Sequence, residues 1–155
     1  MGSSMNERVT FELLQAARAY RVRSAKLLAR IGLYPGQDTL LQLLATHGRM
    51  TMGEAAGALS IQPPTVTKMV NRLTAAGLLT TQVVDRDRRK IAVSLTETAR
   101  AKIDEIEAIW EALEEEALAR LDAESLKRQL STVTRNLSAN GSNIPATLRE
   151  RLPGY

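Results

Sequence analysis

The sequence has no cysteine, one histidine and few aromatic residues, and these shortages exclude several kinds of chemistry. Without cysteine, a chain has no disulfide bonds, no thiolate metal sites and no cysteine nucleophile. The lone His47 fits the end of a helix better than a metal ligand, so we predict no metal site. Because the chain also lacks a glycine-rich phosphate loop and a serine in a nucleophile elbow, we predict no catalytic residues and no enzymatic activity.

Long apolar runs are absent as well. No stretch approaches the ~20 apolar residues that a membrane-spanning helix needs, and no signal peptide is recognisable. We therefore expect a cytoplasmic protein without a membrane partner. At 155 residues and 44% apolar composition, the chain predicts one compact unit. Residues 1–5 resemble an expression scar and are expected to be disordered, and the tail 141–155 shows no clear pattern.

The positive charge is concentrated in one short segment. Six basic and two acidic residues lie between Gln62 and Lys90, so this segment accounts for the whole net charge of +4. The other parts of the chain are neutral when summed. Such a distribution is expected if the basic segment contacts a polyphosphate while the remainder contacts protein or water.

Helical periodicity covers the segments on both sides of the basic region. It predicts a long first helix over about 7–31 and a second over 37–47 that ends at Gly48. Thr51 and Glu54 have the spacing of a capping box, which predicts the start of a short third helix. After the basic region, Thr96 and Asp122 are expected to cap two further helices.

The basic segment itself begins with the pattern of a helix-turn-helix. A three-residue turn at 60–62 precedes Pro63 and Pro64, which are tolerated in the first turn of a helix. The second helix of such a pair enters the major groove of DNA, with its inner face on the core and its outer face on the bases. We assign DNA contacts in this helix to Gln62, Pro63, Thr65, Thr67, Lys68, Asn71 and Arg72.

A hairpin with a charged tip follows this helix. Residues 78–84 and 90–95 are rich in β-branched side chains and predict two strands. A basic wing of this kind can reach an adjacent minor groove, where the negative potential attracts arginine. The residues assigned to the wing are Arg86, Asp87, Arg88, Arg89 and Lys90.

These elements give a mainly α fold with a small β-hairpin wing, in the α+β class. The expected organisation is an N-terminal dimerisation helix at 6–34, a winged helix-turn-helix lobe at 35–96 and C-terminal dimerisation helices at 97–140. Two long amphipathic segments flank the lobe, and one lobe cannot bury both of their apolar faces. This surplus of apolar surface predicts a homodimer.

From Pro35 onward the sequence resembles the multiple-antibiotic-resistance regulator (MarR) family of bacterial winged-helix transcription factors. The motifs that carry the resemblance are IQPPTVTKMVNRL at 61–73, AGLL at 76–79, DRR at 87–89 and VSLT at 93–96. The family pattern closes with glycine where this chain has Ala99. By position, Asp87 resembles the wing aspartate that orients an arginine, and Arg89 resembles the arginine inserted in the minor groove.

The resemblance also implies a function. The chain is expected to be a repressor in a bacterial nucleoid that binds a palindromic operator as a homodimer and is released by a small aromatic or phenolic acid. It needs no other cofactor. The resemblance places an effector cleft between the dimer region and the DNA-binding lobe, and the residues assigned to it are Tyr20, Tyr34 and His47. An architectural protein that binds duplex DNA without an effector is the alternative, and a winged helix that binds protein is another.

Overall fold

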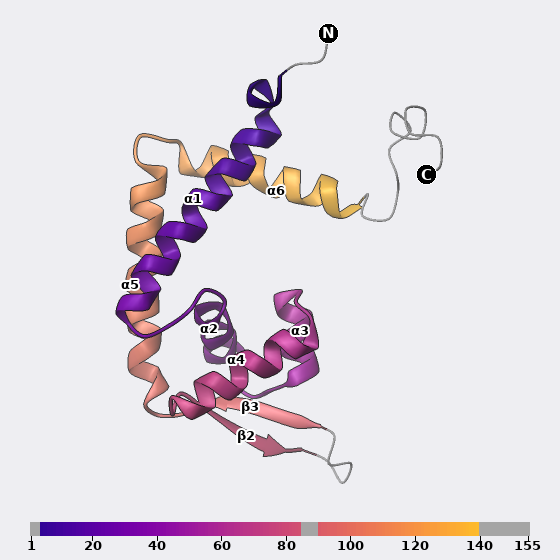
Figure 1. The fold of residues 1–155 in the computed structure, drawn as a ribbon, viewed down its shortest axis with the longest axis vertical. Helices are drawn as coiled ribbons and strands as arrows, with labels where there is room; N and C mark the ends of the chain where they lie inside the picture. The colour runs from indigo at the N-terminus through magenta and orange to yellow at the C-terminus, as the bar shows by residue number, and fades with distance from the viewer. Residues whose placement is uncertain (1–3, 85–89, 140–155) are drawn as a thin grey trace. The chain divides into compact units, whose positions relative to one another are not determined.

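The computed structural model of the chain describes residues 4–84 and 90–139, which form helices and one small sheet (Figure 1). The chain divides into two compact units, Met1–Ala117 and Leu118–Tyr155, and each is described by itself. In chain order the elements are η1 (Met5–Glu7), α1 (Val9–Arg30), α2 (Gln37–His47), β1 (Met50–Thr51), α3 (Met52–Leu59), α4 (Pro63–Ala75), β2 (Leu79–Val83), β3 (Ile91–Leu95), α5 (Ala99–Leu118) and α6 (Ala123–Ala139).

The helices begin close to the predicted positions, with one difference at the start of the chain. α2 has the predicted bounds, whereas α1 begins two residues later than Glu7. The Glu7 carboxylate accepts a hydrogen bond from the Ser4 N–H at 3.0 Å, which closes a separate 3-10 turn. Arg8 then has extended backbone angles, so the long helix starts only after it.

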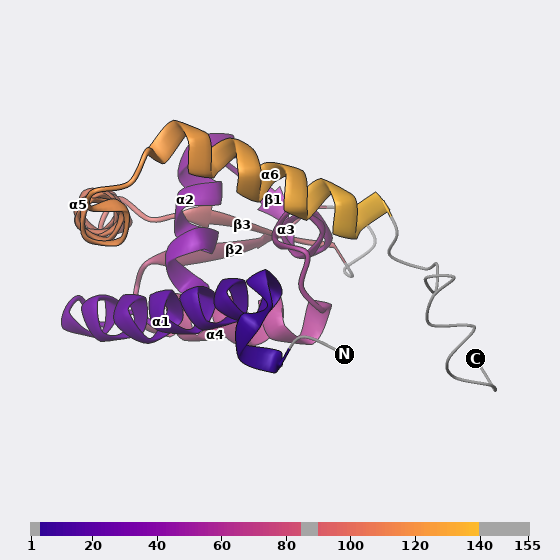
Figure 2. The same ribbon diagram turned by 90° about the horizontal axis from the view of Figure 1, so that it is seen from above.

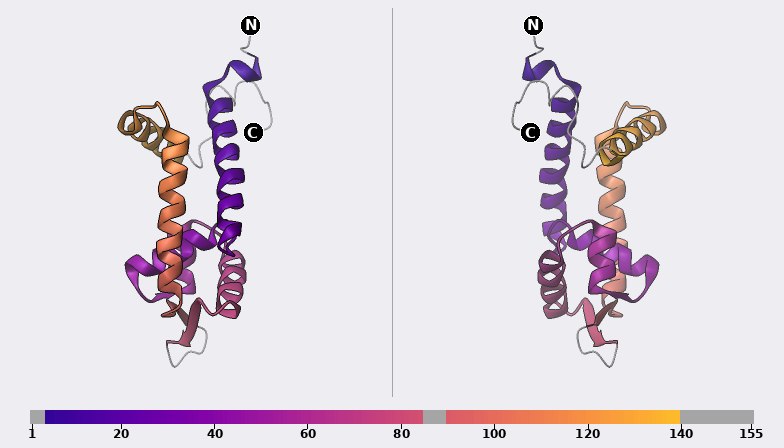
Figure 3. Two further views of the ribbon diagram at one scale, coloured as in Figure 1. Left: turned by 90° about the vertical axis from the view of Figure 1, so that its left-hand side faces the viewer. Right: turned by 90° about the vertical axis from the view of Figure 1, so that its right-hand side faces the viewer.

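The core of the first unit is formed by apolar side chains from helices α1 to α5 and from the sheet. Its largest fully buried members are Leu28, Leu40, Leu41, Leu44, Leu73, Ile106, Val66, Val70 and Val93. α2 lies between α5 and α3, and Figure 2 shows this with α5 viewed end-on. α1 and α5 extend to the same side of the group formed by α2, α3 and α4 (Figure 3). The core therefore lies where α2 meets the helix-turn-helix and the sheet.

The predicted hairpin is confirmed as β2 and β3, and a third strand, β1, extends it to a three-stranded sheet. β3 lies in the middle, paired antiparallel with β2 on one side and with β1 on the other. Met50 pairs with Val93 and Thr51 with Ala92. A strand of two residues has no periodicity to read, and its partner is about forty positions away in the chain, so no local pattern predicts it.

The helix-turn-helix is built from local capping signals. The Glu54 N–H donates to the Thr51 hydroxyl at 3.2 Å, and the Thr51 N–H donates to the Glu54 carboxylate at 2.7 Å, as the capping box predicts. The hydrogen bond from the Thr51 N–H, and after it one that the Thr51 hydroxyl donates to the same carboxylate at 2.9 Å, hold the pKa of the Glu54 carboxyl below its usual value. The turn passes through Ser60 at φ 53°, a left-handed backbone conformation that residues other than glycine, asparagine and aspartate seldom adopt.

The second unit contains α6. The Asp122 carboxylate accepts a hydrogen bond from the Ser125 N–H at 3.0 Å, which is the predicted cap. No residue of α6 is buried, and its large exposed apolar side chains are Leu130, Val133 and Leu137. Across residues 4–84 and 90–139, no helix combines the length and apolar character that a bilayer crossing requires.

A buried carboxylate connects α5 to the start of α2. Asp38 is only 6% exposed, and its two oxygens accept hydrogen bonds from different parts of the first unit. Oδ1 accepts from the Gly36 N–H at 2.9 Å, and Oδ2 accepts from Trp110 Nε1 at 2.9 Å. Asp38 therefore fixes the chain turn before α2 against the only tryptophan, which lies on α5.

We expect the substitution Asp38→Asn to lower the free energy of unfolding by about 1–3 kcal/mol, because the amide nitrogen must then face one of the two N–H donors. Urea denaturation at a fixed protein concentration measures this loss. The same substitution should cost less in a Trp110→Phe background, where one donor is gone. An equal cost in both backgrounds would show that the Trp110 hydrogen bond does not contribute.

Candidate DNA-binding interface

The outer face of α4 carries the residues that the sequence assigned to base and phosphate contacts. Val66, Val70 and Leu73 are fully buried, and the helix repeat of about 3.6 residues places the opposite positions outward. The assigned residues are all exposed: Gln62, Pro63, Thr65, Thr67, Lys68, Asn71 and Arg72. Gln62 is the N-cap residue, and Pro63 and Pro64 are the first two residues of the helix. The structure thus brings the predicted recognition residues onto one helix and leaves them open to a partner.

Two of these side chains already have partners within the protein. The Thr67 hydroxyl donates to the Pro63 carbonyl at 3.1 Å, so it offers DNA an acceptor more readily than a donor. The Arg72 guanidinium lies over the ring of Tyr34, 5.8 Å from the ring centroid. Lys68 and Asn71 lie exposed between them in the sequence.

The tip of the wing falls outside the described residues. Arg86, Asp87, Arg88 and Arg89 belong to this segment, so their predicted roles stay predictions. The ladder beneath the tip is described: the Val84 N–H donates to the Lys90 carbonyl at 2.9 Å. Lys90 is exposed at the end of this ladder, which positions its side chain at the base of the tip.

The sheet also carries a cation that sequence reasoning missed. Arg49 is exposed just before β1, and its Nη1 donates to the Gln82 side-chain oxygen on β2 at 3.1 Å. This contact spans 33 positions of the chain, from one edge strand of the sheet toward the other. Because β1 itself was not predicted, nothing in the sequence indicated that Arg49 lies beside the wing.

The three side chains assigned to an effector lie in different places. Tyr20 lines a cavity of about 300 Å³ between α1 and α5, whose other lining residues are Ala16, Ala19, Arg23, Leu113, Glu116 and Ala117. Tyr34 contacts Arg72, and His47 is exposed at the last position of α2. The predicted set is therefore not gathered around one cavity, and its members must be considered separately.

Both charged and apolar side chains line the Tyr20 cavity. Arg23 Nε lies 3.1 and 3.0 Å from the two carboxylate oxygens of Glu116. Burial raises the pKa of the Tyr20 hydroxyl, and the charges of Asp38 and Glu114 raise it further. Tyr20 therefore remains a neutral hydrogen-bond donor at physiological pH.

In the described part of the chain, no group of acidic residues and histidine is arranged to hold a metal ion.

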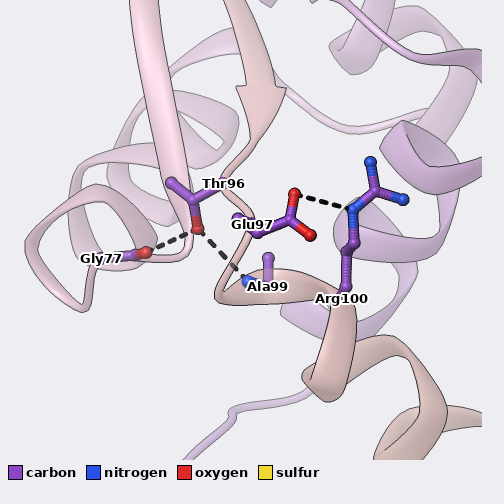
Figure 4. Close-up of polar contacts among 5 residues, drawn as sticks. All are labelled: Gly77, Thr96, Glu97, Ala99 and Arg100. Atoms are coloured by element: carbon purple, nitrogen blue, oxygen red, sulfur yellow. Dashed lines mark hydrogen bonds and ion pairs between the residues drawn. The ribbon is translucent and has the colours of Figure 1, made fainter.

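Thr96 joins the recognition helix, the wing and α5 at one point (Figure 4). Its hydroxyl donates to the Gly77 carbonyl at 2.7 Å and accepts from the Ala99 N–H at 3.3 Å. Gly77 has φ +74° and follows the end of α4, while Ala99 is the first residue of α5 and is fully buried. The helix start therefore accommodates alanine, although the family pattern has glycine there.

A helix-turn-helix followed by a basic wing on a small antiparallel sheet defines a winged-helix DNA-binding protein. Comparison with known proteins identifies the family. The MarR family profile matches residues 24–90. An uncharacterized HTH-type transcriptional regulator of Bacillus subtilis, YwoH, is 33% identical over 117 residues, which cover 76% of this chain and 85% of that protein. The chain belongs to the MarR family and is a DNA-binding transcriptional regulator of this type.

Solved structures share the same fold over most of the chain. BpsR of Bordetella bronchiseptica, whose DNA binding is regulated by 6-hydroxynicotinic acid, has a TM-score of 0.77 at 23% identity, covering 89% of this chain and 98% of its own. A mutant of MarR from E. coli in complex with operator DNA has a TM-score of 0.74 at 19% identity, covering 88% of this chain and 99% of its own. At these identities the likeness establishes the fold.

We expect Thr96→Val to lower the free energy of unfolding by about 0.5–2 kcal/mol, because valine keeps the shape but loses both hydrogen bonds. Thr96→Ser is the matched control, since it keeps the hydroxyl and should stay near the wild type. Urea denaturation of the three proteins measures the difference. If serine is as costly as valine, the methyl group of Thr96 matters and its hydroxyl does not.

Proposed function

We propose that this protein is a homodimeric repressor that reads a palindromic operator with α4 of each subunit and is released by a small aromatic acid. The exposed outer face of α4 is the observation that supports operator recognition by this helix. On that face, Lys68 and Arg72 supply charge for phosphates, and Asn71 supplies an amide that can bond an adenine edge. A dimer bound across a promoter excludes polymerase from the same DNA, which makes repression the simplest outcome.

Exposed apolar side chains support the homodimer. Val9, Leu14 and Val22 on α1 are exposed by 84%, 46% and 58%, and α6 exposes a further apolar group in the other unit. A monomer in water seldom leaves so many large apolar side chains open on two long helices. A second copy of the chain supplies the same surfaces and can cover them with twofold symmetry.

We call the exposed outer face of α4 in each subunit the reading head. Selection of bound duplexes from random DNA tests whether it recognises a sequence. We expect the wild type to enrich an inverted repeat with half-site centres about one helical turn apart, ~34 Å. Asn71→Ala should change the preferred bases within each half-site but keep the spacing, because the dimer sets the spacing. Lys102→Ala, on α5 and paired with Glu105, is the control and should keep the wild-type preference.

If no sequence is enriched at fixed salt, the proposal of an operator-binding repressor is wrong. The architectural alternative is then favoured, since an architectural protein binds operator and scrambled DNA equally. If Asn71→Ala prefers the same site as the wild type, Asn71 does not contact a base, and the rest of the proposal is unaffected.

The cavity beside Tyr20 is the site that we propose for the effector. Three alanines and Leu113 line it, which leaves room for a flat ring, and Arg23 is among its lining residues. A carboxylate can replace Glu116 as the partner of Arg23, and a phenolic oxygen can accept from the neutral Tyr20 hydroxyl. Regulation of the structurally similar BpsR by 6-hydroxynicotinic acid supports an aromatic acid. Occupation of this cavity would bias the α1–α5 arrangement and, through it, the two reading heads.

Hydroxybenzoic acids should raise the melting temperature of the protein and weaken its binding to the selected operator. The corresponding hydroxybenzamides, which lack the carboxylate, should do neither. Arg23→Gln should lower the apparent affinity for the acid about tenfold or more, because a charge-assisted hydrogen bond is lost. Equal effects of acid and amide, or an Arg23→Gln variant that responds like the wild type, would overturn this site.

A further inference from the structure

The loop between α1 and α2 contacts the recognition helix at two points. The Tyr34 ring lies under the Arg72 guanidinium at 5.8 Å, a distance at which a cation is attracted to an aromatic face. Two residues later, a Cβ atom on Gly36 would lie 3.4 Å from the Met69 side chain, so the loop backbone runs directly against α4. Most of the helix-turn-helix separates Tyr34 from Arg72 in the sequence, and only the fold brings them together.

Buried polar side chains at the start of α2 hold this loop in place. The Tyr34 N–H donates to the Gln37 side-chain oxygen at 2.9 Å, and the Gly36 N–H donates to Asp38 at 2.9 Å. Gln37 and Asp38 are only 5% and 6% exposed. The Tyr34 backbone is therefore fixed from the protein interior, while its ring is directed outward at 64% exposure. A fixed backbone that carries an exposed ring is a suitable platform for a long, flexible side chain.

We propose that Tyr34 is a positioning residue for DNA binding, whose ring holds the Arg72 guanidinium ready to meet the operator. The inference rests on the proposed function, in which Arg72 contacts DNA. An arginine side chain has several rotatable bonds, and ordering it on binding costs entropy. A ring that orders the guanidinium in the free protein removes part of this cost. Tyr34 is thus assigned to DNA binding, whereas the sequence analysis assigned it to effector binding.

A double-mutant cycle on the selected operator tests the assignment. Tyr34→Leu should weaken binding about two- to fivefold, the effect expected of one exposed cation–π contact. Tyr34→Phe keeps the ring and should bind like the wild type. In an Arg72→Ala background, Tyr34→Leu should have no further effect, because the group that it positions is gone. In a Lys68→Ala background, which removes a neighbouring cation on the same helix, Tyr34→Leu should show its full effect.

Fluorescence anisotropy with a labelled duplex at fixed salt gives all of these affinities. Equal losses from Tyr34→Leu with and without Arg72 would overturn the proposal, because a general loss of loop structure acts independently of Arg72. A Phe variant as weak as the Leu variant would overturn it too, since the hydroxyl would then matter instead of the ring.

The failure of this inference differs from that of the proposed function. If the wild type selects no operator, the proposed function fails and the inference fails with it. If Arg72→Ala weakens binding while Tyr34→Leu does not, the reading head stands and only the positioning role is lost. If Arg72→Ala has no effect, Tyr34 has no contact to position and the inference is wrong.

Discussion

The two hydrogen bonds accepted by the buried Asp38 carboxylate connect α5 to the loop before α2, which contacts α4. One bond holds Gly36, and with it the loop that runs against α4; the other holds Trp110 on α5. A buried carboxylate is costly unless it is fully hydrogen-bonded, so the three groups are constrained together. Asp38 therefore links α5 to α4 indirectly, through the loop at Gly36 that lies against Met69.

Thr96 supplies a second constraint, just beyond the end of α4. There the Thr96 hydroxyl ties the turn after the recognition helix to the first residue of α5. α5 is therefore connected to α4 by two routes, one through Asp38 and the loop before α2, the other through Thr96. A displacement of α5, such as the one proposed for a ligand beside Tyr20, would be transmitted to α4 through these two hydrogen-bonded connections.

Much of the fold followed from local signals. The capping box at Thr51, the prolines that open α4 and the glycine after α2 act within one or two turns, so their outcome does not depend on distant residues. The inward positions Val66, Val70 and Leu73 followed from the helical repeat. Three features did not follow: the strand β1, the left-handed Ser60 and the separate turn at Met5–Glu7. β1 and Ser60 depend on a distant contact or a backbone conformation that has no local pattern, whereas the turn at Met5–Glu7 has the Ser4–Glu7 spacing of a capping box, which the sequence analysis missed.

The sequence by itself determined most of the secondary structure, the exposed face of α4 and the concentration of positive charge between Gln62 and Lys90, because periodicity, caps and charge are properties of neighbouring residues. Only the tertiary structure decided which side chains from distant segments meet. It brought Tyr34 under Arg72, Arg49 beside Gln82 and Trp110 to Asp38. It also separated Tyr20, Tyr34 and His47, which the sequence had grouped. Such contacts arise when the core packs, and packing involves pairs of residues whose separation in the chain leaves no local trace.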